Sequence, residues 1–129
     1  MISLKDGISM KQFKGKTSEL NLSISIVEMG ADLNVMIMGG EKPHIGAVAI
    51  AIPHVSLSNP DKVGVSTSLM TVTGHKEDDI ARTSADFLAR SLRSLVVVTC
   101  GIHSRNLTKE LINKKKVIFL FNVKKKKVP

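Results

Sequence analysis

Two neighbouring stretches of the chain alternate apolar and polar residues with a period of two. The apolar positions are Leu20, Leu22, Ile24 and Ile26 in the first stretch, and Leu33, Val35 and Ile37 in the second. This is the period of a half-buried β-strand, because successive side chains of a strand point to opposite faces. Met29-Gly30-Ala31-Asp32 supplies a turn between them. The pattern predicts an antiparallel hairpin, so the fold must include a sheet.

Two further strands are predicted, from Ile45 to Ile52 and from Val65 to Val72, with a loop over residues 53–64. The first of them carries only alanines on one face, at Ala47, Ala49 and Ala51. Val48, Ile50 and Ile52 occupy the other face. A face of alanines lets a helix or a second subunit approach closely. On this basis, and because exposed apolar surface usually finds a partner, we expect a homodimer.

The period changes to 3.6 residues in EDDIARTSADFLARSLR, residues 77–93, which predicts an amphipathic helix. Its apolar face is Ile80, Ala81, Ala85, Leu88 and Leu92, and Asp78 and Asp79 suit its first turn. Leu95 to Thr99 is predicted as a buried strand, and Thr108 as the N-cap of a last helix. VIFLFNV, residues 117–123, stays open between helix, strand and frayed end. The expected fold is α+β, in the order β-β-β-β-α-β-α, an antiparallel sheet with two helices packed on one face.

Composition and charge exclude several classes of function. At 129 residues, the chain is expected to form one domain over 1–129. Its single cysteine and the lack of a secretory pattern favour the cytoplasm, and no apolar run approaches the length of a membrane-spanning helix. The net charge of +8 resides mainly in residues 109–129, which hold eight lysines against Glu110. A basic tail without Trp or Tyr argues against a nucleic-acid-binding groove.

The segment GGEKPHIGAV, residues 39–48, places three glycines and a proline around one histidine. So many glycines indicate that the backbone comes close to something, either another strand or a ligand. An anion or cofactor pocket would use the amides of Gly39, Gly40, Gly46 and Gly74, with Lys42, Lys76 and imidazoles as further donors. Plain turns are the alternative, since Glu77, Asp78 and Asp79 would repel an anion and neither GxGxxG nor GxxxxGK occurs.

Three histidines, His44, His75 and His103, each stand where a predicted strand meets a loop or helix. They converge if the sheet brings these junctions to one edge. Cys100-x-x-His103 is the nearest approach to a metal-binding pattern, but it lacks the paired ligands that metal sites need. A cysteine that follows a run of valines lacks the environment that lowers a thiol pKa. We therefore expect neither a metal site nor a catalytic residue.

The segments GGEKPHIGAV, TGHKEDDIAR and VVVTCGIHSRNLTKE resemble the small family that includes the D subunit of bacterial gallate decarboxylase, described as a prenylated-flavin chaperone. The resemblance covers roughly residues 17–112, and PHIG and GIH are its most specific parts. It implies a fold similar to that of proteasome-assembly chaperones, a sheet flanked by helices that commonly dimerises. The lysine-rich end after Asn113 departs from the acidic, regular helix that this resemblance leads us to expect.

The resemblance implies a non-catalytic chaperone or carrier that binds prenylated flavin mononucleotide and assists maturation of a prenylated-flavin-dependent decarboxylase. Without Trp or Tyr, a bound flavin would lie on Met, Ile or backbone surfaces. The alternative is a ligand-free assembly adaptor, in which the same residues shape an edge that binds a partner protein. The candidate cofactor-binding residues are Gly39, Gly40, Lys42, His44, Gly46, His75 and His103.

Overall fold

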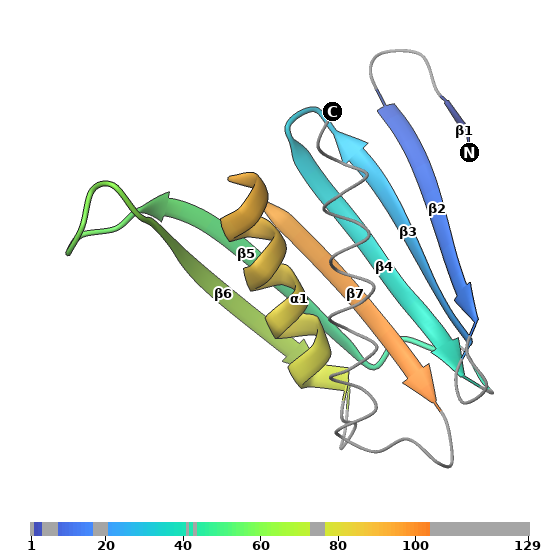
Figure 1. The fold of residues 1–129 in the computed structure, drawn as a ribbon. Coiled ribbons are helices and arrows are strands. Elements are labelled where there is room, and N and C mark those ends of the chain that lie inside the picture. The colour runs from blue at the N-terminus through green and yellow to red at the C-terminus, as the bar shows by residue number, and fades with distance from the viewer. Residues whose placement is uncertain are drawn as a thin grey trace.

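The computed structural model describes residues 2–3, 8–16, 21–40, 42, 44–72 and 77–103. These residues form one sheet of seven strands and one helix (Figure 1). The elements are β1 (Ile2–Ser3), β2 (Ile8–Lys16), β3 (Asn21–Met29), β4 (Asp32–Gly40), β5 (Ala47–Val55), β6 (Val63–Thr71), α1 (Glu77–Leu92) and β7 (Val96–His103). In the described part of the chain, no helix is long and apolar enough to cross a membrane.

The strand order across the sheet is β1-β2-β3-β4-β7-β5-β6, so the last strand in sequence lies between β4 and β5. All neighbouring strands are antiparallel except β4 and β7, which run parallel. The expectation of a purely antiparallel sheet is therefore wrong, and the sheet is mixed. The physical reason is the connection through α1: a chain that leaves β6 and returns after a helix enters the sheet in the direction of β6, and hence of β4.

The hairpin predicted from the alternating pattern is confirmed as β3 and β4. Its register places Ile24 opposite Ile37 and Ile26 opposite Val35, all four of which are buried. Gly30 adopts a left-handed φ of 62° in the turn, which glycine does without a Cβ penalty. The buried side chains of β3 and β4 continue into those of β7, at Val96, Val98 and Cys100, to form one core.

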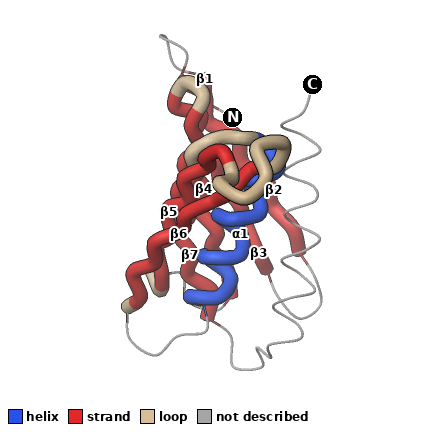
Figure 2. The backbone as a smooth tube through the Cα atoms, turned by 90° about the vertical axis from the view of Figure 1, so that its left-hand side faces the viewer, coloured by secondary structure: helices blue, strands red, loops and turns tan. Residues whose placement is uncertain are grey.

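Helix α1 crosses the alanine face of β5, because it joins β6 to β7 and these strands flank β5 (Figures 1 and 2). The three alanines of β5 are fully buried beneath it. The helix presents Ala81, Ala85 and Ala89 to the core, so small residues on both elements allow close packing. Its acidic first turn is as predicted, and it ends before Arg93, whose φ of 52° terminates the helix. The alanine face, one of the two grounds for expecting a homodimer, is therefore covered by α1, and the homodimer itself stays a prediction.

Several boundaries differ from those expected. Strand β2 was not predicted from the sequence, and β5 and β6 extend to Val55 and from Val63, so the loop between them is shorter than residues 53–64. The described part of the chain contains one helix where two were expected. The helix predicted from Thr108 and the apolar run 117–123 lie outside the described residues.

Candidate functional site

Four segments that are distant in sequence meet at one end of the sheet, the lower end in Figure 1. They are the carboxyl ends of β4 and β7, the segment 44–46 that leads into β5, and the first turn of α1. Gly40 pairs with His103 in the parallel register of β4 and β7. The Gly46 amide donates to the Cys100 carbonyl over 2.9 Å, and the Val72 amide donates to the Gly46 carbonyl over 2.8 Å. Backbone hydrogen bonds therefore fix this junction.

His44 and Glu77 form an ion-pair contact at the centre of this junction. Nε2 of His44 lies 3.0 Å from Oε1 of Glu77, and the carboxylate side chain is only 3% exposed. The same Oε1 accepts a hydrogen bond from the Ile102 amide over 3.3 Å. Nδ1 of His44 donates a hydrogen bond to the Lys42 carbonyl over 3.0 Å, so each ring nitrogen faces a group of the fold. The imidazole thus ties the segment before β5 to the start of α1.

Two glycines make room for this pair. A Cβ on Gly101 would overlap the backbone carbonyl oxygen of His44, and a Cβ on Gly46 would lie 2.9 Å from the Glu77 carboxyl carbon. The segment that carries His44 therefore lies directly on the backbone of β7. The close approach of the Glu77 side chain explains Gly46, and that of the His44 backbone explains Gly101, so neither glycine requires a ligand.

The structure places the predicted site residues in different environments. Gly39 and Gly40 end β4, with Gly40 at a φ of 82°, and Lys42 is exposed beside His44. The Gly46 amide is occupied within the fold. His75 lies outside the described residues, and His103 is placed only by its backbone, as the last residue of β7. The strand ends and the start of α1 share one end of the sheet, whereas convergence of three imidazoles stays a prediction.

Sequence reasoning treated Glu77 only as a charge that repels anions and missed its contact with His44. The two residues are 33 positions apart, so no local spacing relates them. The available signal was a glutamate at the first position of a helix with an apolar face, where a carboxylate complements the helix dipole. That signal does not reveal burial.

Four residues with exposed or partly exposed side chains lie around the contact between His44 and Glu77. We call Lys42, His44, Ile45 and Val72 the His44 surface. The His44 side chain is 26% exposed. Ile45 and Val72 are 59% and 52% exposed, and Val72 is hydrogen-bonded to Gly46, the residue that follows Ile45. The surface therefore combines two cationic or hydrogen-bonding groups with two apolar side chains.

Cys100 is buried beneath the site and is not built for nucleophilic chemistry. Burial raises the pKa of its thiol to about 12, and the nearby Glu77 carboxylate adds to the effect. The described residues contain no group of three or more His, Cys, Asp and Glu side chains placed to hold a metal ion.

We expect the Cys100 thiol to make stability depend on pH in alkaline solution. The folded-state pKa of about 12 lies above the ordinary value of 9.0, so the unfolded chain releases this proton first. The free energy of unfolding should therefore be unaffected below pH 9 and should fall as the pH rises from about 9 toward 12. Urea unfolding between pH 8 and pH 10.5 measures this slope. The Cys100→Ala variant should show a shallower slope, and equal slopes would contradict the expectation.

A comparison with solved structures identifies the fold. The fold is similar to a chain of a crystal structure described as a novel chaperone complex for yeast 20S proteasome assembly, with a TM-score of 0.52 and 15% identity. The likeness covers 90% of this chain and 91% of the yeast chain, and it establishes the fold alone. A search of curated proteins found no match.

A match to a protein-family model identifies the family of this chain more specifically than the fold does. Residues 16–119 match the family described as the prenylated flavin chaperone LpdD-like domain, and the chain belongs to this family. The match spans β3 to β7 and every segment that forms the junction around His44. The resemblance stated from the sequence is confirmed.

Proposed function

We propose that the protein is a non-catalytic chaperone that binds prenylated flavin mononucleotide as cargo and assists maturation of a prenylated-flavin-dependent decarboxylase. The observation that carries this proposal is membership of the prenylated flavin chaperone family over a span that includes the whole His44 junction. The raised thiol pKa of Cys100 agrees with a role outside catalysis.

The His44 surface has the chemistry that such a cargo requires. Lys42 would meet the phosphate or a flavin oxygen through a charge-assisted hydrogen bond, and the exposed edge of the His44 ring would lie beside it. Ile45 and Val72 offer an apolar surface for the ring system or the prenyl-derived part. Because the chain has neither Trp nor Tyr, aliphatic contact replaces aromatic stacking.

Glu77 limits where an anion would lie. Its carboxylate already accepts a hydrogen bond from the Ile102 amide and contacts Nε2 of His44. A phosphate would therefore bind on the exposed side of the ring. The ion pair would then hold the imidazole in place and partly offset the acidic charge beneath it. Gly39 pairs with both β3 and β7, whereas Gly40 lies beyond the last residue pair with β3, so the Gly40 amide remains the candidate for a further donor at the end of β4.

Lys42→Ala tests the proposal without disturbing the core. The side chain is exposed, so the melting temperature should change little. The dissociation constant for prenylated flavin mononucleotide should rise about tenfold, corresponding to about 1.4 kcal/mol of lost charge-assisted bonding. Fluorescence titration with prenylated and ordinary flavin mononucleotide measures both ligands. Lys62→Ala is the matched control, because Lys62 is also exposed but lies in the distant turn between β5 and β6.

A ligand-free assembly adaptor is the second candidate, and one observation favours it. The glycines that attracted attention in the sequence are used internally, Gly46 against Glu77 and Gly101 against His44. In that case the His44 surface would bind a partner protein through Ile45 and Val72. Saturating prenylated flavin that leaves the titration flat for the unmodified protein would exclude the cargo proposal and leave the adaptor.

A further inference from the structure

One edge of the sheet is open in the described structure, because β6 ends the strand order and pairs only with β5. The hydrogen bonds from Ser56 to Lys62 and from Val72 to Gly46 continue the same register and identify the even-numbered residues of β6 as those bonded to β5. Backbone groups of its odd-numbered residues therefore point outward along the edge. At one end, Nη1 of Arg90 donates to the Val63 carbonyl, which leaves Val65, Thr67, Leu69 and Thr71 with outward backbone groups.

This edge lacks the features that usually prevent strands from pairing. The sequence VGVSTSLMT contains no charged residue and no proline. Proteins commonly protect an exposed edge with lysine, proline, a bulge or a covering element. Strand β6 is also nine residues long, and Met70, near its carboxyl end, is 78% exposed. An uncharged strand of this length can lie against a copy of itself without repulsion.

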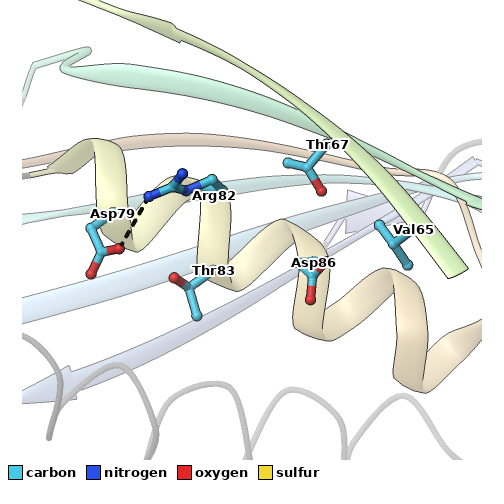
Figure 3. Close-up of a pocket in the computed structure, with 6 residues that line it drawn as sticks. All are labelled: Val65, Thr67, Asp79, Arg82, Thr83 and Asp86. Carbon is cyan, nitrogen blue, oxygen red and sulfur yellow. Dashed lines mark ion pairs between the residues drawn. The ribbon is translucent and has the colours of Figure 1, made fainter.

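A groove runs between this edge and α1, with a volume of about 440 Å³ (Figure 3). It is lined by Val65, Thr67, Asp79, Arg82, Thr83 and Asp86. Arg82 lies 3.7 Å from Asp79, and Asp86 pairs with Arg90, so the acidic and basic groups around the groove balance. Thr67 Oγ1 is buried and makes no hydrogen bond within the described structure.

We propose that a second copy of this chain docks at this edge, with the two β6 strands antiparallel about a two-fold axis at Thr67. In that register, Thr67 faces Thr67 of the second copy and Val65 faces Leu69. Each facing pair exchanges two backbone hydrogen bonds through its outward groups. The two Thr67 hydroxyl groups then satisfy each other, and valine packs on leucine on the α1 side. The pairing joins two sheets into one continuous sheet and is independent of the function proposed above.

Self-complementarity favours this edge over the face of the sheet that α1 leaves uncovered. That face carries Val48, Ile50 and Ile52, and it is the other place where two copies could meet. Its apolar side chains would suit many partners. The β6 edge has both an unpartnered hydroxyl and a register in which Thr67 faces its own equivalent and Val65 faces Leu69.

A cysteine placed at the two-fold axis tests the proposal directly. Facing residues of a bonded antiparallel pair have Cα atoms about 5.5 Å apart, which suits a disulfide. We expect Thr67→Cys to give mostly disulfide-linked dimer on mild oxidation. Met70→Cys is the control, because it is more exposed but would lie about 20 Å from its own equivalent in this register. Native Cys100 is buried and common to both variants.

Light scattering of two lysine variants completes the test. The unmodified protein should have twice the chain mass of 14.0 kDa at micromolar concentration. Thr67→Lys places two like charges at the axis and should give the chain mass, whereas Ile50→Lys, on the opposite face, should remain dimeric. A monomeric unmodified protein overturns the proposal. Equal cross-linking of the two cysteine variants, or dissociation by Ile50→Lys alone, also overturns it.

Discussion

Gly101→Ala should be among the most destabilising single substitutions in this chain. The added Cβ would overlap the carbonyl oxygen of His44, which belongs to the backbone and cannot rotate away as a side chain would. The segment before β5 must therefore move off β7, at a cost of about 3 kcal/mol or more. We expect the melting temperature to fall by more than about 10 °C in a calorimetric scan.

Gly30→Ala is the matched control for this substitution. Gly30 has a φ of 62° but no atom within 4 Å of an added Cβ, so its cost is conformational only, about 1 kcal/mol. Gly46→Ala should fall between the two, because its Cβ meets the end of the Glu77 side chain. If Gly101→Ala costs no more than Gly30→Ala, the close contact between His44 and β7 is wrong.

His44→Ala should destabilise the fold by about 2 kcal/mol, more than a surface turn would predict. The substitution removes the imidazole that lies 3.0 Å from a carboxylate whose side chain is 3% exposed, and a buried carboxylate that loses its neighbour is costly. In a Glu77→Gln background the same substitution should cost at least about 1 kcal/mol less, since a neutral amide still accepts from the Ile102 amide. Urea unfolding of the four proteins measures this coupling.

The alternative outcome is equally informative. An identical cost of His44→Ala in both backgrounds would mean that the imidazole contributes packing and its Lys42 hydrogen bond, without an ion pair. Flavin affinity must then be compared per folded molecule, since a loss of stability alone would imitate a loss of binding. Lys62→Ala serves as a variant remote from the His44 surface in such titrations.

Local patterns in the sequence predicted most elements of the described fold. The alternation around residues 22–37 and the helical period of residues 77–92 depend on which face of one element is buried, and a single segment carries that information. The position of β7 does not follow from any local pattern. Its valine run indicates burial, but only the return from α1 places it beside β4 and makes that pair parallel.

The site was predictable in part for the same reason. The glycine and histidine segments marked the strand ends that meet around His44. The role of the glycines could not be predicted, because a glycine that makes room for a ligand and a glycine that makes room for another strand look alike in sequence. Glu77 was assigned the wrong significance since its burial depends on β5 and β7 closing over the first turn of α1.

The central position of β7 also bears on how the chain folds. Strands β1 to β4 form one antiparallel unit and β5 with β6 another, and in the described sheet β7 alone connects them. During synthesis both units emerge before β7, each with an open edge, at β4 and at β5. Contacts that span such long sequence separations form slowly, so the two edges stay exposed until the last strand inserts. We expect completion of the sheet to be a late step, with α1 holding β7 close to the gap that it fills.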